Sequence, residues 1–173
     1  MILADTSVWV EFFRGSGHPA AAKLKGLLAR RADVAITEVV LMEVLAGRRS
    51  GAHAEEARAQ LIALPVLRLE GPADFETAAG IYRACRDAGY TIRSQLDLLI
   101  AVPAIRHGAS LLHNDRDFEV IARHSALKLE PLVSASENGG HVGERSGTYT
   151  RRTVRPRPRT SRNPRSKRLA SKA

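Results

Sequence analysis

Four acidic residues of this 173-residue sequence lie in or beside apolar segments, where a carboxylate needs a partner. Asp5 follows an apolar N-terminal run, and two residues separate Asp115 from the apolar end of segment 110–112. Glu43 and Asp97 lie inside apolar stretches whose spacing is typical of helices. A buried acid is costly unless a cation or a full set of hydrogen-bond donors meets it. Several such acids at strand and helix ends predict one acidic pocket that binds a hard divalent cation.

Apolar periodicity and turn residues predict strands that alternate with helices. Ser7, Asp74 and Ser94 are the expected N-caps of three of the helices. This alternation favours an α/β fold: a three-layer α/β/α arrangement around a short, mainly parallel sheet with helices on both faces. The expected strands are 2–4, 34–36, 66–69, 110–113 and 127–129, and the expected helices, caps included, are 7–13, 20–31, 37–47, 54–64, 74–88, 94–108 and 116–123.

The predicted topology brings the acids to one edge of the sheet. In such a sheet, ligands bind beyond the carboxyl ends of the strands, where the strand order reverses. Asp5 leaves the first strand at that edge, and Asp115 leaves the strand over 110–113 in the same direction. Asp97 lies near the start of its helix and Glu43 about two turns into its own. We therefore expect the four carboxylates to converge.

Each acid also has a purely structural interpretation. Asp5 could cap the helix that follows it, Asp97 fits a capping box with Ser94, and Asp115 lies in a sequence that favours a turn. Glu43 is the hardest to explain in this way, because no cation lies near it in the sequence. Four independent caps need not share one edge, so the combined pattern favours a site. A cluster already neutralised by the chain's own Lys or Arg would contradict it.

The net charge of +9 comes from the C-terminal segment. Residues 151–173 contain ten Lys or Arg and no acid, which leaves 17 basic and 18 acidic residues in the first 150. A Gly-rich stretch over 138–147 precedes this segment. We predict a folded domain over 1–133, followed over 134–173 by a Gly-rich linker and a basic disordered tail. The tail is either an inert terminus or a segment attracted to nucleic-acid phosphates.

The remaining composition narrows the function classes. The single Cys85 excludes an intrachain disulfide and suits a reducing cytosol. Apolar runs are too short to cross a bilayer, and acids interrupt anything like a signal peptide, so we expect a cytoplasmic protein without a membrane partner. Trp9, Phe12 and Phe13 form an apolar cluster that we assign to the core rather than to an interface.

Four short motifs carry the candidate acids in a distinctive order. They are Asp5-Thr6-Ser7 after the first strand, Glu43-Val44-Leu45-Ala46-Gly47, Asp97-Leu98-Leu99-Ile100-Ala101, and Asn114-Asp115-Arg116-Asp117-Phe118. Together they resemble the PIN domain and, more narrowly, the VapC toxins of bacterial toxin–antitoxin pairs, over about residues 1–133. The resemblance implies that the four acids are catalytic and bind the metal, that Asp117 is a fifth ligand or a supporting acid, and that Thr6 contacts substrate through its hydroxyl.

The resemblance also implies a function. It predicts a metal-dependent endoribonuclease that acts as a toxin, with Mg²⁺ or Mn²⁺ as its cofactor. Crowded carboxylates repel one another, and a divalent cation relieves that repulsion while making a water easier to deprotonate for attack on a phosphodiester. The expected partners are an RNA cut in single-stranded loops and a small VapB-like antitoxin, in a homodimer or a toxin–antitoxin hetero-oligomer. An antitoxin Arg that reached the carboxylates would inhibit the enzyme.

Two residues depart from a simple match. The PIN family usually has Thr or Ser two residues before the fourth acid, where this chain has His113. Pro103 lies inside the helix that carries Asp97, where its missing N–H and its ring predict a kink.

Three other interpretations remain open. A Toprim-type enzyme shares the Asp115-Arg116-Asp117 pattern but needs Glu where this chain has Asp5. A haloacid-dehalogenase-like phosphatase needs a second Asp at the position of Ser7. The third is a non-catalytic RNA-binding module of the same fold that uses the basic tail for affinity.

Overall fold

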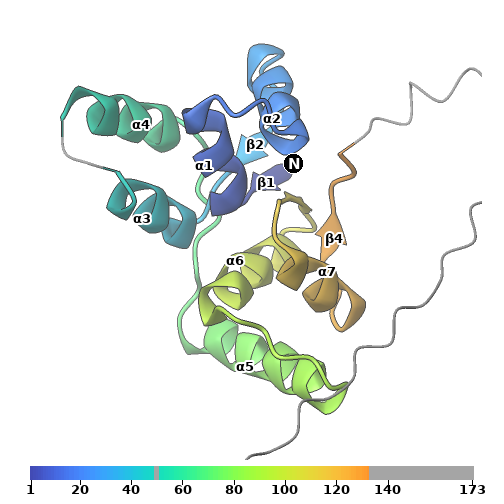
Figure 1. Cartoon of the computed structure of the whole chain (residues 1–173). Coiled ribbons are helices and arrows are strands. Elements are labelled where there is room, and N and C mark those ends of the chain that lie inside the picture. Colours follow the sequence, from blue (N-terminus) through green and yellow to red (C-terminus); the bar gives the residue numbers. More distant parts are fainter. Residues whose placement is uncertain (49–50, 133–173) are drawn as a thin grey trace, which may run out of the picture. The chain divides into compact units, whose positions relative to one another are not determined.

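A short parallel sheet forms the centre of the chain (Figure 1). The computed structural model describes residues 1–48 and 51–132. All strand pairs are parallel, in the order β2-β1-β3-β4, and the register sets Ile2 opposite both Val34 and Ser110. The strands are β1 (Ile2–Ala4), β2 (Val34–Ala35), β3 (Ser110–Leu112) and β4 (Lys128–Leu129).

Two groups of helices cover the sheet. α1 packs on α2 and α3, and α3 packs on α4, whereas α5, α6 and α7 pack on one another, so the two groups gather separately (Figure 1). This arrangement confirms the predicted α/β fold with a short parallel sheet. The helices are α1 (Thr6–Arg14), α2 (Pro19–Ala29), α3 (Glu38–Ala46), α4 (Ala52–Ile62), α5 (Pro72–Asp87), α6 (Gln95–Arg106) and α7 (Arg116–Arg123).

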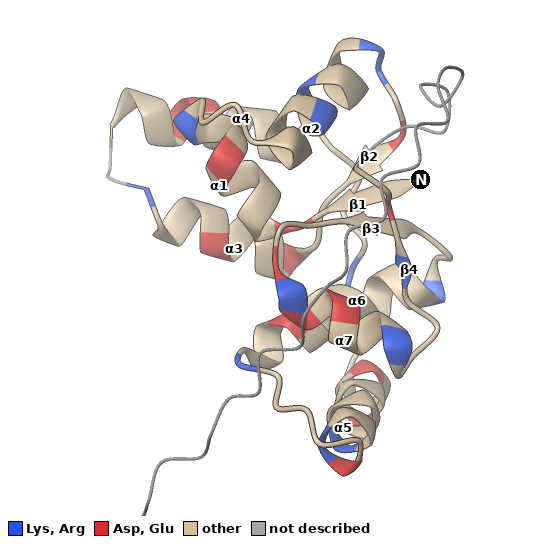
Figure 2. Cartoon of the chain, turned by 45° about the vertical axis from the view of Figure 1, so that its right-hand side comes forward, with Lys and Arg blue, Asp and Glu red and all other residues tan. Residues whose placement is uncertain are grey.

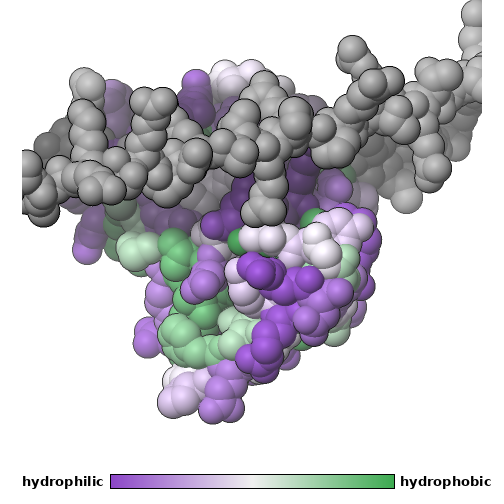
Figure 3. Space-filling model, turned by 60° about the horizontal axis from the view of Figure 1, so that its bottom comes forward, coloured by the Kyte–Doolittle hydropathy of each residue, from purple (hydrophilic) through white to green (hydrophobic). Residues whose placement is uncertain are grey.

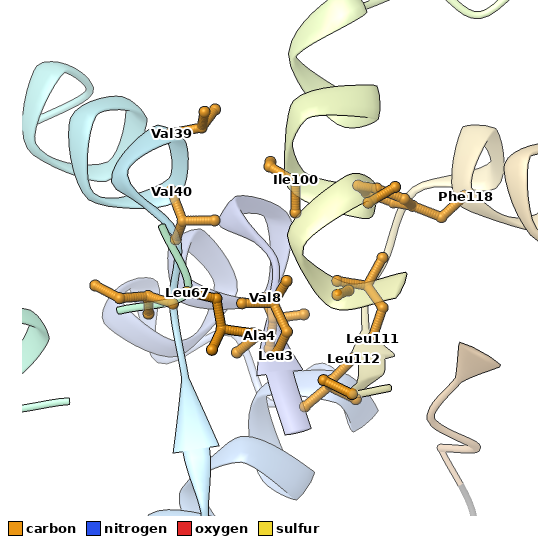
Figure 4. Close-up of a cluster of buried hydrophobic side chains, with 14 of the residues drawn as sticks. Leu3, Ala4, Val8, Val39, Val40, Leu67, Ile100, Leu111, Leu112 and Phe118 are labelled. Carbon is orange, nitrogen blue, oxygen red and sulfur yellow. The ribbon is translucent and has the colours of Figure 1, made fainter. Parts of the chain in front are cut away.

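The core lies between the strands and the inner faces of the helices (Figure 4). Leu3 of β1 and Leu111 of β3 are fully buried, as are Ile100 of α6 and Phe118 of α7. Strands that are buried on both faces read as continuous apolar runs, which explains why short segments such as Ser110–Leu112 were identifiable from the sequence. The core therefore holds α6 and α7 firmly against β1 and β3.

The strand order reverses between β1 and β3. The chain leaves β1 toward β2 on one side and enters β3 on the other, so these neighbouring strands form the topological switch point of the sheet. The Asp5 N–H donates to the Leu112 carbonyl at 3.0 Å, which ties the carboxyl ends of the two strands together. Residues that follow β1 and β3 are therefore placed side by side.

Three local predictions were wrong. The expected strand over 66–69 is reduced to a single parallel bridge between Val66 and Ile36. Asp5, not Ser7, is the N-cap of α1, because its carboxylate accepts the Ser7 N–H. Asp74 is not a cap: α5 starts at Pro72, whose missing N–H suits a first helical position, and Asp74 lies in the first turn.

The N-terminal aromatic cluster belongs to the core, as predicted. Trp9 is fully buried, and its ring centroid lies 5.7 Å from those of both Phe12 and Phe13. The two phenylalanines are partly buried against the core, and the Arg48 guanidinium lies 4.2 Å from the Phe13 ring centroid. Helix α1 ends just beyond this cluster at Gly15, whose φ of 64° is a conformation that favours glycine.

The surface is mixed in character. Figure 3 shows one face on which apolar and hydrophilic residues both reach the surface. A groove of about 360 Å³ between α5 and α6 is lined mainly by apolar side chains, among them Phe75, Tyr82 and Leu99. In the part of the chain that the structure describes, no helix has the length and apolar character needed to cross a bilayer. The predicted linker and tail, 134–173, lie outside the described residues.

Candidate active site

The predicted acids occupy the start of three helices and the middle of a fourth. Asp5 caps α1 directly after β1, and Asp115 caps α7 shortly after β3. Asp97 is in the first turn of α6, and Glu43 lies farther along α3. Figure 2 shows acidic segments where α6 and α7 approach the strand ends. The helix starts that carry these acids thus meet at the switch point.

Ser7 fixes Asp5 and joins it to the loop after β3. Its N–H and its hydroxyl both donate to Asp5 Oδ2, at 2.8 and 2.5 Å. The same hydroxyl accepts the Asn114 N–H at 2.9 Å, so one side chain links the residues that follow β1 and β3. Burial raises the pKa of Asp5 to about 6 even though hydrogen bonds from Ser7 and Thr6 act in the opposite direction. Glu43 adds a smaller like-charge contribution.

Thr6 connects Glu43 to the same corner. The Thr6 hydroxyl donates to Glu43 Oε2 at 2.6 Å, across 37 residues of sequence. Thr6 is the first residue of α1, directly after Asp5, so this bond draws α3 toward the end of β1. The hydroxyl that the sequence assigned to substrate contact therefore orients a carboxylate in this structure.

Asp115 and Asp117 share a cation that the sequence analysis missed. Arg93 Nη2 donates to Asp115 Oδ1 at 2.5 Å, and Arg93 Nε donates to Asp117 Oδ2 at 3.1 Å. The Arg93 backbone N–H also donates to Asp117 Oδ2, at 2.8 Å. The cluster is thus partly neutralised, with one guanidinium against five carboxylates. Sequence offered one weak signal, since Arg93 directly precedes the Ser94 cap of the Asp97 helix.

Asp97 is the acid without a partner. Among the described residues no donor lies within hydrogen-bond distance of its half-buried carboxylate, and the Ser94 hydroxyl accepts from Leu96 N–H instead. The capping-box alternative for Asp97 is therefore wrong. Burial is the largest cause that raises its pKa to about 7, and the charges of four other acids add to it. Those acids are Asp5, Asp115, Asp117 and Glu43, so all five predicted carboxylates interact electrostatically.

The hydrogen bonds leave free carboxylate oxygens at this corner. The close hydrogen bonds of Asp5, Glu43 and Asp115 each fall on a single oxygen, and Asp97 has none. Within the described residues, Trp9 Nε1 is the one buried side-chain polar atom left without a hydrogen bond, so none of these free oxygens is fully cut off from solvent. Capping and metal binding are thus compatible roles for the same acid, because each uses a different oxygen.

The side chains do not form a preassembled metal cage. As they stand, no three His, Cys, Asp or Glu residues in the described ranges are grouped to hold a metal ion. The fit to Mg²⁺ or Mn²⁺ rests on donor chemistry: several carboxylates with open oxygens and mutual repulsion, which are the ligands these cations prefer. Asp117 fits less well, because the Arg93 guanidinium and the Arg93 backbone N–H both bind its Oδ2, so a cation of the chain already compensates the charge on that oxygen.

The two departures from the PIN pattern are His113, which precedes Asp115, and Pro103, which follows Asp97. His113 Nδ1 donates to the Asp115 backbone carbonyl at 2.8 Å, and its ring lies 5.5 Å from that of Phe118. Burial lowers the pKa of His113, which favours its neutral form. Helix α6 continues past the buried Pro103 to Arg106, so Asp97 keeps its place in the first turn.

The sequence matches the PIN domain family over residues 2–124. The chain belongs to this family. "VapC ribonuclease Mb1587" of Mycobacterium bovis and "Ribonuclease VapC11" of Mycobacterium tuberculosis are each 46% identical to it over 129 residues. The matched segment covers 74% of this chain and 96% of either relative.

Two solved structures share the fold. VapBC2 from Rickettsia felis bound to a promoter DNA fragment aligns with a TM-score of 0.57 at 24% identity, covering 75% of this chain and 98% of the other. FitAcB from Neisseria gonorrhoeae aligns with a TM-score of 0.58 at 19% identity, covering 76% and 98%. These alignments support the α/β architecture described above.

Proposed function

We propose that this PIN domain is a metal-dependent endoribonuclease that acts as the toxin of a toxin–antitoxin pair. The observation that carries the proposal is the open, unpaired carboxylate of Asp97 beside four other acids, at the switch point of a parallel sheet. An acid that is half-buried and repelled by its neighbours is costly for the fold and well suited to bind a cation. The names of the 46% identical relatives, both ribonucleases, support the same activity.

Asp5, Glu43, Asp97 and Asp115 would hold the cation, which is Mg²⁺ or Mn²⁺. A divalent cation bound there supplies charge stabilisation to the scissile phosphate and a more acidic water for hydrolysis. We assign Asp117 a supporting role, because its contacts with Arg93 hold the loop that precedes α6. Without a cation this acidic corner repels an RNA backbone, so metal binding and substrate binding are coupled.

The chain's own residues orient the carboxylates. Ser7 holds one oxygen of Asp5, and Thr6 holds one oxygen of Glu43. Each hydrogen bond restricts the rotation of a side chain, so the free oxygen points in a defined direction without added ordering cost when a ligand binds. The β1 end thus positions two of the four acids through consecutive hydroxyl residues.

The expected partners are an RNA substrate and a small VapB-like antitoxin. The two structural neighbours quoted above are titled VapBC2 and FitAcB, and a third neighbour is titled a toxin–antitoxin complex from Klebsiella pneumoniae. The pairing of Arg93 with Asp115 and Asp117 shows that these carboxylates accept a guanidinium. An antitoxin arginine directed at Asp97 would use the same chemistry. We place the chain in a homodimer or a toxin–antitoxin hetero-oligomer.

Chelation and truncation test the proposal against a non-catalytic RNA-binding module. The purified chain should cleave RNA with Mg²⁺ or Mn²⁺, stop in EDTA and recover when the metal is returned. A truncation at about residue 135, which removes the basic tail, should keep metal-dependent cleavage of a short RNA. A module that depends on the tail would instead lose its RNA affinity on truncation and show no cleavage at any metal concentration.

A further inference from the structure

Among the described residues, Arg93 is the cation that contacts the acid cluster. It lies in the loop between α5 and α6, two residues before α6 begins, and its side chain is 68% exposed. Its guanidinium uses two different nitrogens, Nη2 toward Asp115 and Nε toward Asp117, while its backbone N–H binds Asp117 as well. One residue is thus attached to two acids and to the start of the helix that carries Asp97.

We propose that Arg93 is a positioning residue for metal binding: it fixes Asp115 and the start of α6 so that their free carboxylate oxygens face the same cation. This inference rests on the proposed metal-dependent nuclease function. Arg93 and the Asp117 N–H both donate to Asp115 Oδ1, which leaves Oδ2 for a cation. The backbone contact with Asp117 sets where α6 starts, and Asp97 follows in its first turn.

The effect of removing Arg93 on metal binding distinguishes a positioning role from two other roles of this cation. If Arg93 competed with the metal for carboxylates, its removal would tighten metal binding. If it served only to bind RNA phosphate, its removal would weaken RNA binding and leave metal binding unchanged. A positioning role predicts weaker metal binding, because the Asp115 carboxylate and the α6 start become free to rotate.

The contribution of Arg93 to the free energy of unfolding should be small, so its effect on metal affinity can be measured on a folded protein. Ion pairs whose cation is largely exposed to solvent contribute little to folding. The Asp117 carboxylate would keep the backbone N–H of residue 93 after the side chain is removed, so it is not left without a donor. A change in metal affinity in an Arg93 variant would therefore report on the site rather than on unfolding.

The experiment is a calorimetric titration of the full chain with MnCl₂, with EDTA removed beforehand. We expect Arg93→Ala to weaken Mn²⁺ binding by about 10- to 100-fold, in the range found when groups that orient metal ligands are removed. Arg93→Lys should recover only part of this loss, because a point charge cannot bind both acids in the fork geometry. Arg86→Ala is the matched control: it removes an exposed arginine of α5 that has no ion pair among the described residues, and should bind Mn²⁺ like the unmodified chain.

Steady-state cleavage provides a second readout. Because metal and RNA binding are coupled, Arg93→Ala should lower kcat/KM at sub-saturating metal, and excess Mn²⁺ should restore much of it. Wild-type or tighter Mn²⁺ affinity in Arg93→Ala would overturn the positioning role, as would a rise in the KM for RNA that excess Mn²⁺ does not correct.

Asp97→Asn, titrated in parallel, separates this inference from the function on which it rests. If Asp97→Asn loses Mn²⁺ affinity and Arg93→Ala does not, the positioning role of Arg93 is wrong and the proposed metal site stands. If Asp97→Asn binds Mn²⁺ as well as the unmodified chain, the proposed metal site is wrong and the inference falls with it.

Discussion

Asp74 and Asp97 occupy the same position in neighbouring helices but have opposite surroundings. Each is the third residue of its helix, Asp74 in α5 and Asp97 in α6. Asp74 is 5% exposed, and its Oδ2 accepts the Glu70 N–H at 2.7 Å and Arg106 Nη2 at 3.1 Å. Asp97 has no such donor among the described residues, and the nearby acids carry the same negative charge.

The contrast gives these two acids opposite effects on the fold. Asp74, whose Oδ2 is met by a cation and a backbone N–H, stabilises the fold, whereas Asp97, which is surrounded by like charges, destabilises it until a ligand arrives. Helix α6 carries both kinds of contact, since Arg106 at its last turn binds Asp74 while Asp97 lies in its first turn. One helix thus links the stability of the domain to its candidate site.

Replacing Asp97 should have the largest effect on activity. We expect Asp97→Asn, and likewise Asp5→Asn, to lower metal-dependent RNA cleavage by more than about 100-fold, because a lost ligand should cost at least as much as a lost supporting group. The fold should remain intact, since Asp97→Asn removes an unpaired charge and an amide oxygen at position 5 can still accept from Ser7. Cleavage rates and growth toxicity measure the effect, and full cleavage by either purified variant would remove that residue from the catalytic set.

Replacing Asp74 should give the opposite result. Asp74→Asn leaves Arg106 without its buried carboxylate, and we expect the free energy of unfolding to fall by about 1.5–3 kcal/mol. The folded fraction should cleave RNA at nearly the unmodified rate. Urea denaturation and cleavage assays on the same preparation test this. If Asp74→Asn lost activity and kept its stability, the contrast between the two acids would be mistaken.

Ser7 allows a finer test of the active corner. Ser7→Ala removes the hydroxyl donor to Asp5 and the acceptor for the Asn114 N–H, so the pKa of Asp5 should rise above about 6. The backbone donor of residue 7 remains, so we expect only about a 10-fold loss of cleavage near neutral pH. Thr77→Ala, which removes an exposed hydroxyl bonded to a carbonyl of α5, is the control and should cleave normally. An unchanged cleavage rate in Ser7→Ala would mean that Asp5 needs no such anchor.

The smallest effect is a pH dependence of stability in EDTA. The pKa of Asp97 is about 7 in the folded chain and near 3.8 when unfolded, so between these values the folded state holds a proton that the unfolded state has lost. The free energy of unfolding should therefore fall as pH rises from about 4 to 7 and then level off. Asp97→Asn should reduce this decline to the part that Asp5, with its pKa of about 6, contributes, whereas Asp74→Asn should keep the whole decline. If the free energy of unfolding had the same slope against pH in all three proteins, folding would not raise the pKa of Asp97.

Much of the fold was predictable because local and global signals agree. Short apolar runs and capping residues predicted β1, β3 and each helix of the described residues to within a few residues. The exceptions depend on distant contacts: Val66 pairs only with Ile36, and the role of Asp74 is set by Arg106, 32 residues away. No local sequence pattern predicts either partner.

The acids of the candidate site could be proposed from the sequence, but the groups that hydrogen-bond to them could not. Asp5 and Asp115 stand out because they follow buried strands, and the PIN resemblance adds Glu43 and Asp97. Arg93 is hidden, because the bond between residues 93 and 115 is created by the packing of α6 and α7 rather than by any sequence spacing. The sequence also could not show that capping and open oxygens coexist on one carboxylate.

Anomalous diffraction from a crystal of this protein soaked in Mn²⁺ is the most direct test. We predict a manganese peak at the switch point, coordinated by Asp97 and by free oxygens of Asp5, Glu43 and Asp115. A peak at Asp74 and Glu70 instead, or none at millimolar Mn²⁺, would contradict the assignment of this corner as the metal site.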